Sequence, residues 1–395
     1  MKTQRSHKIR LCPNDKQRGY FSRACGCARF TYNWALQEWK RQYESGEKPS
    51  PFSLKKKFNS IKRQQFPFVT KVTKCAVEQP FIDLGRAFKN FFRNIKAGKK
   101  PGYPRFKKKG IKDSFYIAND RIQFNGKKVK IPKLGWVKMR ESLRFEGKIL
   151  STTISSIAGM WFISVQVEEE VSIPKPTKIA IGVDVGIKTL ATVSDGRVFE
   201  NPKALKSAEN KLRCCQKSVS RKKKGSKNRK KAVLRLQRQH YRISNIRKDS
   251  IHKLTTAITK SCGVLGIEDL NVKGMLKNHK LARALSDASL SETHRQLEYK
   301  SKWFGVEVFK ADRFYPSSKT CSKCGNIKSD LTLSDREYHC GVCGLIIDRD
   351  LNASINLESV AVGSTVLACR LGSSGLSAMQ INETTDWAGI SLKSA

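Results

Sequence analysis

Two pairs of cysteines have the spacing of a metal site. The first pair is Cys321 and Cys324, and fifteen residues separate it from the second pair, Cys340 and Cys343. In a zinc ribbon each Cys-x-x-Cys pair presents two thiolates, and two pairs complete a tetrahedron. Because four thiolates leave no position open for water, the spacing predicts one structural Zn²⁺. His339, beside Cys340, is an alternative ligand.

Three acidic residues stand at the ends of predicted elements. Asp184 and Glu268 each end an apolar strand, and Asp350 opens a predicted helix. Because an unpaired acid is costly to bury, these acids are either paired with basic residues or share metal ions. Carboxylate oxygens suit Mg²⁺, and two such ions would promote hydrolysis of a phosphodiester. We interpret the three acids as ligands of two Mg²⁺ ions, with Asp348 as a competitor of Asp350 or a helix cap.

The overall charge points to a polyanionic partner. The chain has 395 residues, with 78 Lys and Arg against 33 Asp and Glu, and a formal net charge of +45. Such an excess favours nucleic acid over an anionic membrane surface. A ribosome-type basic protein is the alternative that composition leaves open.

Two segments concentrate the positive charge. Residues 86–110 hold ten Lys and Arg and no acid, and residues 211–253 hold seventeen and one acid. Aromatic residues interleave with the first segment, where they either stack on bases or form the core stripe of a helix. Nine of these cations are candidate nucleic-acid contacts: Lys99, Lys100, Arg105, Lys107, Lys108, Arg221, Lys222, Lys223 and Lys224.

Composition also bears on the compartment. No run of about 18 apolar residues is present, so no membrane span is expected. The first residues lack the apolar stretch of a secretory signal, which predicts a cytoplasmic protein with reduced thiols. The eight cysteines outside the two pairs are therefore given no role.

The first part of the chain alternates between strand and helix patterns. Residues 1–13 predict a strand, residues 14–110 have helical periodicity, and residues 111–173 alternate as strands do. Asn125-Gly126 predicts a hairpin turn. We expect the first strand to join the later strands in a small β-barrel or sandwich, so that the helical part is an insertion.

The second part begins after a linker at residues 174–176. Its two apolar strands flank a basic helical hairpin at about residues 203–258, which bends at Arg221-Lys-Lys-Lys-Gly-Ser. The tail, residues 359–395, has no net charge, is rich in Ser, Gly and Ala, and is expected to be disordered.

Four segments resemble the TnpB family, nucleases that are encoded by insertion sequences and are related to type V CRISPR effectors. They are Gly182-Val-Asp-Val-Gly-Ile-Lys-Thr-Leu-Ala191, Gly266-Ile-Glu-Asp-Leu270, Arg313-Phe-Tyr-Pro-Ser-Ser-Lys-Thr-Cys-Ser-Lys-Cys-Gly325 and Asp348-Arg-Asp-Leu-Asn-Ala-Ser-Ile-Asn356. The resemblance covers roughly residues 7–358.

The resemblance implies an α+β multidomain fold. Its parts would be a β-barrel wedge domain (1–13 and 111–173), a helical recognition lobe (14–110), an RNase H-like RuvC nuclease domain (174–312 and 347–358) and an inserted zinc ribbon (313–346). The acidic triad of the RuvC domain would be Asp184, Glu268 and Asp350.

The resemblance also implies an activity and its partners. A guide RNA from the protein's own mobile element would direct cleavage of double-stranded target DNA beside a short motif, with Mg²⁺ as cofactor. The sequence leaves monomer and dimer both open, and we favour the monomer. Two alternatives are a nuclease-inactive, RNA-guided repressor and a DNA-binding zinc protein or transposase. The intact acids argue against the first, and the absence of a recognisable end-recognition or synapsis domain argues against the second.

Overall fold

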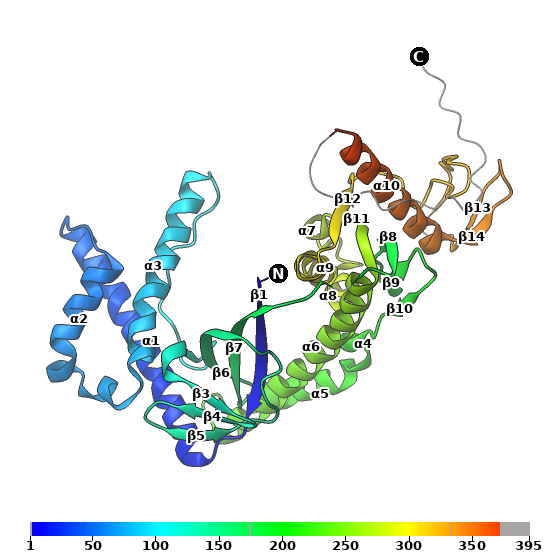
Figure 1. Cartoon of the computed structure of the whole chain (residues 1–395). Coiled ribbons are helices and arrows are strands. Elements are labelled where there is room, and N and C mark those ends of the chain that lie inside the picture. Colours follow the sequence, from blue (N-terminus) through cyan, green and yellow to red (C-terminus); the bar gives the residue numbers. More distant parts are fainter. Residues whose placement is uncertain (1, 174, 333, 372–395) are drawn as a thin grey trace. The chain divides into compact units, whose positions relative to one another are not determined.

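The computed structural model describes residues 2–173, 175–332 and 334–371, and it divides into two compact units (Figure 1). Of the described residues, those up to 175 and 202–253 form unit 1, and 176–201 with those from 254 to 371 form unit 2. The long helix α6 (Lys227–Ser261) crosses from the first unit into the second. Each unit has its own hydrophobic core.

Three helices of unit 1 pack on one another and lie side by side in Figure 1. Asn14 caps the first: its side chain accepts from the N–H of Gln17, whose side chain accepts from the N–H of Asn14. Ser50 and Ser53 cap the second helix in the same reciprocal way. The elements are α1 (Asp15–Glu44), α2 (Pro51–Gln65), the 3₁₀ turn η1 (Pro67–Lys71) and α3 (Lys74–Lys96).

The strands of unit 1 form two antiparallel sheets on the core that they share with the helices. The larger sheet has the order β1-β7-β6-β2 and the smaller β3-β4-β5, and Leu11 and Met139 form a bridge between them. The N-terminal strand thus pairs with strands that follow the helices in sequence. The elements are β1 (Lys2–Leu11), β2 (Ser114–Ala118), the 3₁₀ turn η2 (Asn119–Arg121), β3 (Gln123–Asn125), β4 (Lys128–Ile131), β5 (Gly135–Lys138), β6 (Lys148–Ile157) and β7 (Met160–Glu170).

The hairpin turn at Asn125-Gly126 is confirmed. Asn125 pairs with Lys128 across the two residues of the turn, and Gly126 has a φ of 51°, a left-handed conformation that glycine adopts at little cost.

The basic helical hairpin consists of α5 (Glu209–Ser220) and α6, preceded by the short α4 (Ala204–Ser207), and it bends at the predicted residues. Nη1 of Arg229 closes the bend by donating to the carbonyl oxygens of Val219 (2.8 Å) and Lys222 (3.2 Å). Residues 202–253, which include most of the hairpin, belong to unit 1. One reason is packing: the ring centroids of Tyr241 and Phe162 lie 5.7 Å apart.

Unit 2 is built on a five-stranded mixed sheet of order β10-β9-β8-β11-β12. Strands β8, β11 and β12 run parallel, while β9 and β10 extend the sheet in antiparallel pairs. The strands are β8 (Lys178–Asp184), β9 (Thr189–Val193), β10 (Val198–Glu200), β11 (Cys262–Glu268) and β12 (Glu307–Ala311). Between β11 and β12 lie α7 (Val272–Met275), α8 (Ala282–Ala288) and α9 (Leu290–Phe304).

The last described elements are the ribbon strands β13 (Glu337–His339) and β14 (Ile346–Asp348) and the helix α10 (Arg349–Leu371). The helix continues beyond residue 358, where the sequence predicted the start of a disordered tail. Ala361 explains the difference, because it is fully buried against Ala180 and Val264 of the sheet. Residues 372–395 lie outside the described part of the chain. Among the described helices, none has the length and apolar character needed to cross a membrane.

Candidate functional site

Asp184 and Glu268 end neighbouring parallel strands at the same edge of the sheet of unit 2. Strands β8 and β11 are in register, with Gly182 opposite Gly266 and Val183 opposite Ile267. Because side chains alternate between faces, Asp184 and Glu268 project from the same face as the two glycines. The register therefore places the two predicted acids side by side.

The third acid is delivered by α10, which packs across β8 and β11 on that face. A Cβ atom at Gly182 would lie 1.9 Å from the carbonyl oxygen of Ser354, and one at Gly266 would lie 2.2 Å from that of Leu357. Only glycine allows the helix backbone to approach the sheet this closely. Asp350, one turn before Ser354, thereby comes to the strand ends that carry the other two acids.

The three acids influence one another electrostatically. The pKa of Asp184 is raised to about 8, mainly by burial and further by the carboxylates of Glu268 and Asp350. Arg349 opposes this shift, and its Nη2 lies 3.4 Å from Oδ1 of Asp350. An oxygen-only donor set whose members repel one another fits a hard divalent cation such as Mg²⁺, which would favour all three in the ionised form.

Asp348 caps the helix that carries Asp350. Its Oδ1 accepts from the backbone N–H of Asp350 (2.9 Å) and of Leu351 (3.0 Å). These are two of the four N–H groups that a helix leaves free at its first turn. The sequence left two roles open for Asp348, and the structure shows that it is the helix cap.

Ser317 was not predicted as a site residue, yet it contacts the triad. Its hydroxyl donates to Oε1 of Glu268 over 2.5 Å, and its own backbone carbonyl accepts from Nδ2 of Asn356 on α10 (2.7 Å). Ser317 is 4% exposed, and a serine within a run of polar residues gives no periodic signal that would have revealed it.

A second asparagine of α10 fastens the start of the ribbon to the helix. The side-chain amide of Asn352 donates to the carbonyl of Thr320 (2.7 Å) and accepts from the N–H of Ser322 (2.9 Å). The Asn356 amide also reaches Thr320 (2.7 Å). Two buried amides, one turn apart, thus connect the ribbon with the helix of Asp350.

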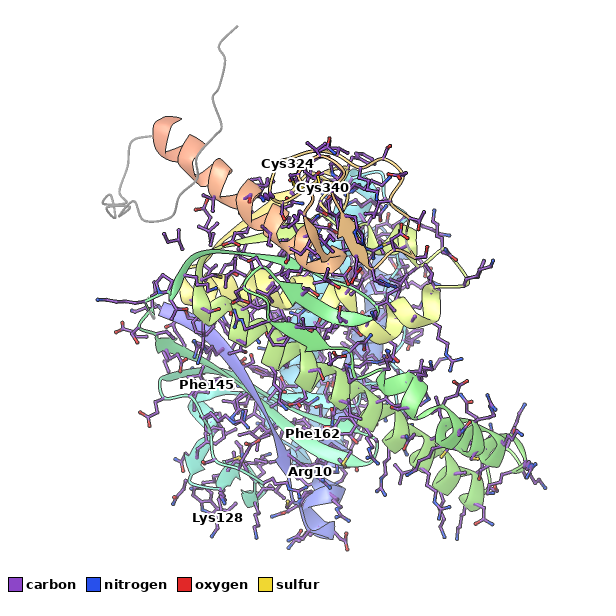
Figure 2. All side chains as sticks on the ribbon, turned by 90° about the vertical axis from the view of Figure 1, so that its right-hand side faces the viewer. Arg10, Lys128, Phe145, Phe162, Cys324 and Cys340 are labelled. Atoms are coloured by element: carbon purple, nitrogen blue, oxygen red, sulfur yellow. The ribbon has the colours of Figure 1, made fainter. Side chains whose placement is uncertain are left out.

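The four predicted cysteines come together. Their sulfur atoms all lie within 4.8 Å of one another, with Cys321 3.5 Å from Cys343 and Cys324 3.5 Å from Cys340. Figure 2 labels two of them in the ribbon. His339 instead lies with Nε2 3.4 Å from Glu337, outside the cluster. Within the described residues the carboxylates of the triad do not form so tight a group.

The two halves of the ribbon have matching backbone geometry. The N–H of Gly325 donates to the carbonyl of Cys321, and that of Gly344 to Cys340. Both glycines have a positive φ, 76° and 70°, which a tight turn after each cysteine pair requires. This is a four-cysteine zinc-ribbon cluster, and closed tetrahedral thiolate sites of this kind are structural.

The nine candidate nucleic-acid contacts differ in their surroundings. Lys107 is occupied within unit 1, because its Nζ lies 4.1 Å from the Tyr32 ring and 3.8 Å from Oδ2 of Asp83. Lys222 is half-buried, with Nζ 3.4 Å from Oγ of Ser218. The other seven are exposed: Lys99, Lys100, Arg105, Lys108, Arg221, Lys223 and Lys224.

The aromatic residues among these cations differ in their burial. Phe88 is buried and stacks on Trp39 with ring centroids 4.1 Å apart. Phe92, Tyr103 and Phe106 are about half exposed, at 48%, 48% and 56%. Phe92 continues the helical stripe of Phe88, with ring centroids 6.2 Å apart, and Tyr103 packs on Phe88 at 5.6 Å. Part of each of the three exposed rings remains accessible at the surface.

Three protein-family models match parts of the chain. One described as "Probable transposase" covers residues 162–279, a "Cas12f1-like, TNB domain" covers residues 291–357, and a "Helix-turn-helix domain" covers residues 1–48. The last description does not fit the local structure, because strand β1 and the single helix α1 account for the secondary structure of residues 2–44.

A relative that matches nearly the full length of the chain shows the family to which the chain belongs. A protein of Streptomyces pristinaespiralis named "Putative RNA-guided DNA endonuclease" is 36% identical over 92% of this chain and 90% of its own length. The chain belongs to the TnpB family of RNA-guided DNA endonucleases. InsQ of Escherichia coli K12, which bears the same description, is 35% identical over 93% of this chain and 94% of its own length. The resemblance noted in the sequence is thereby confirmed.

More distant relatives connect the family with CRISPR effectors. The endodeoxyribonuclease Cas12f1 of Sulfoacidibacillus thermotolerans is 28% identical over 140 residues, 34% of this chain and 32% of its own length. A solved Cas12f1–sgRNA–target DNA complex aligns with 90% of this TnpB-family chain and 99% of its own at 16% identity, with a TM-score of 0.35. That likeness is too distant to inform the site.

Proposed function

We propose that this TnpB-family chain cuts DNA by hydrolysis, with Asp184, Glu268 and Asp350 as the ligands of Mg²⁺. The observation that supports this most strongly is the placement of the acids: Asp184 and Glu268 end neighbouring parallel strands, and α10 brings Asp350 to the same strand ends. Bound Mg²⁺ would stabilise charge on the attacking water and the leaving oxygen. In this proposal Ser317 orients Glu268, and the Asp348 cap fixes the first turn of α10.

A cleft beside Glu268 provides a place for the DNA backbone. It has a volume of about 340 Å³, and Lys273, Arg295, Lys310 and Arg313 contribute to its lining. Arg295, Lys310 and Arg313 each pair with an acid, Glu292, Glu298 and Asp269, so a phosphate would compete with these acids for them. Lys273 would meet a phosphate group near Glu268 most directly. Arg313 is itself held at this place by a 2.5 Å contact with Asp269.

The proposed partners are a guide RNA from the protein's own mobile element and a double-stranded DNA target. The net charge of +45 and the exposed cations of residues 99–108 and 221–224 support a polyanionic partner. Pairing between guide and target would supply sequence specificity, and the protein would contact the backbones. We further propose that the chain acts as a cytoplasmic monomer.

A short motif beside the target would be read in unit 1. A groove of about 410 Å³ lies between α3 and the sheet, and its lining includes Gln79, Asp83, Arg86 and Tyr116. Amide, guanidinium and phenol groups at one place suit hydrogen bonding to base edges. In this proposal the two sheets of unit 1 act as a wedge domain and helices α1 to α3 as a recognition lobe.

The RNA partner provides the test of this proposal. The protein should be purified from cells that carry its gene with the natural flanking DNA, and the bound RNA should be sequenced. We expect one RNA species that maps to the end of the element. Protein free of RNA would instead favour a plain DNA-binding zinc protein, and guided binding without cleavage would favour a repressor.

A further inference from the structure

The small sheet β3-β4-β5 presents one exposed aromatic ring among cations. Its inward residues Val129, Ile131 and Val137 are almost fully buried. The residues that alternate with them face solvent, and none of them is acidic. We name six of these exposed residues the platform: Gln123, Asn125, Lys128, Lys130, Trp136 and Lys138.

The strand register arranges the platform in two rows. Lys130 lies between Gln123 and Trp136 in one row, and Lys128 lies between Asn125 and Lys138 in the other. Directly opposite side chains in an antiparallel pair have their Cβ atoms about 5 Å apart. Nζ of Lys130 lies 6.0 Å from the centroid of the Trp136 ring, which is 43% exposed. One aromatic surface therefore stands beside three ammonium groups.

The backbone of the platform is fixed by the rest of unit 1. Nε2 of Gln17 donates to the carbonyl of Trp136 (3.0 Å), and the N–H of Cys12 donates to that of Lys138 (2.8 Å). Beside the ring is a hollow of about 440 Å³, to which Asn14, Gln17 and Asn125 contribute. If a ring of a ligand stacked on Trp136, side-chain amides in this hollow would lie near its edge. Lys128, at the same hollow, is labelled in Figure 2.

We propose that the platform binds an unpaired nucleotide segment of RNA, with one base stacked on Trp136. Aromatic rings of sheets bind single strands in this way, because every base has a face that can stack. The amide of Asn125 would hydrogen-bond base edges or a 2′-hydroxyl, and Lys128 and Lys138 would meet the phosphates. Paired bases of a duplex cannot occupy the site, since their faces are already stacked.

The commitment to RNA rests on the proposed function, in which a folded guide RNA accompanies the protein. Loops and ends of such an RNA carry unstacked bases, whereas a target duplex and an RNA–DNA duplex do not. The displaced DNA strand is the competing source of unpaired bases, and the experiment separates the two.

The probe is an oligouridine of about 15 nucleotides, the upper range of single-strand site sizes. It contains 5-iodouridine, which forms covalent bonds with nearby aromatic side chains under light. The full-length chain is irradiated with this RNA, and the joined peptides are identified by mass spectrometry. We expect a crosslink at Trp136 that Trp136→Ala abolishes. The same substitution should weaken binding of the unmodified RNA about tenfold, and Trp136→Phe should restore most of it.

Controls separate stacking from general attraction to a basic protein. Tyr43→Ala removes a more exposed aromatic residue of α1, which stands beside Glu44, and should leave binding unchanged. The double change Lys128→Ala with Lys138→Ala should lower the salt dependence of log K by about 1.4, at about 0.7 for each phosphate that is no longer neutralised. Each variant should keep its thermal unfolding midpoint, because all of these side chains are exposed.

Three results would overturn the inference. They are crosslinks that avoid Trp136, an unchanged affinity in Trp136→Ala, and an oligothymidine of equal length that competes better than the RNA. The last would assign the platform to displaced DNA. Guided cleavage measured on the same preparations keeps the two proposals apart. Cleavage without the crosslink contradicts only the platform, and the crosslink without cleavage contradicts only the proposed nuclease activity.

Discussion

Gly182 on β8 lies directly opposite Gly266 on β11, and the backbone of α10 passes over both. The two glycines stand two residues before Asp184 and Glu268, on the same face of the sheet. Their missing side chains let the helix come close enough to bring Asp350 to the other two acids. The glycine pair therefore sets the distance between the strands and the helix of the triad.

Substitution of Gly182 by Ala should displace α10. The new Cβ would stand 1.9 Å from the carbonyl oxygen of Ser354, and overpacking of this kind costs about 1–3 kcal/mol of unfolding free energy. Guided cleavage should fall roughly a hundredfold, because a shift of about 1 Å misplaces Asp350. Thermal unfolding and plasmid cleavage measure the two effects. Gly363→Ala, at an exposed position of the same helix, is the control, since no atom lies within 4 Å of the added methyl group. Equal effects of the two changes would contradict this account.

Loss of the Ser317 hydroxyl should weaken the metal site without unfolding the protein. Ser317→Ala leaves Oε1 of Glu268 without the hydrogen bond that orients it, and removal of such partners costs roughly 10–100-fold in metal affinity or activity. We expect weaker Mn²⁺ binding, measured by calorimetry, and cleavage that needs more Mg²⁺. Ser317→Thr should retain function, and the neighbouring Ser318→Ala should behave as wild type. Unchanged Mn²⁺ affinity in Ser317→Ala would show that the hydroxyl has no positioning role.

Asp348 and Asp350 should differ sharply when each is replaced by Ala. Asp348→Ala removes the cap of α10, which costs about 1 kcal/mol, and Asp348→Asn should keep that cap. Most of the cleavage activity should survive in both variants. Asp350→Ala should abolish cleavage at an unchanged unfolding temperature. If Asp348→Ala were as inactive as Asp350→Ala, Asp348 would have to be a ligand rather than a cap.

The ribbon should be necessary for cleavage as well as for zinc. Wild-type protein should contain about one Zn²⁺ per chain, and Cys324→Ser should lose it. Without the metal the ribbon should unfold, and Ser317, which lies just before the first cysteine, should no longer hold Glu268. Elemental analysis and plasmid cleavage test this together. Cys214→Ser, at an exposed cysteine outside the ribbon, should change neither; wild-type protein without zinc would refute the assignment.

The chemical groups could be predicted from the sequence because each has a local signature. A few neighbouring residues are enough to recognise an acid at the end of an apolar strand. The same is true of cysteine pairs at a fixed spacing. The pairing of Gly182 with Gly266 could not be predicted from the sequence, because only the register of two distant strands brings these glycines together. Ser317 was missed for the same reason, since its partner Glu268 lies 49 positions away in the chain.

The end of the last helix was predicted wrongly for a different reason. A composition rich in Ser, Gly and Ala predicts disorder when a segment has no surface to cover. Ala361 belongs to such a segment, yet its methyl group fills a gap between Ala180 and Val264 of the sheet. Small side chains are favourable there because the helix lies so close to the strands. A tertiary contact, which composition does not report, thus accounts for helix beyond residue 358.

The central claim is that Asp184, Glu268 and Asp350 hold the metal ions that cut DNA. Its most direct test is cleavage of a plasmid with a matched target by the protein–guide complex, in Mg²⁺ or in chelator, for wild type and Asp184→Ala. We predict metal-dependent cleavage by wild type and a loss of a thousandfold or more in the variant, about 4 kcal/mol of transition-state stabilisation. Guide and target binding should persist. Cleavage that continues in Asp184→Ala, or in chelator, would contradict the claim.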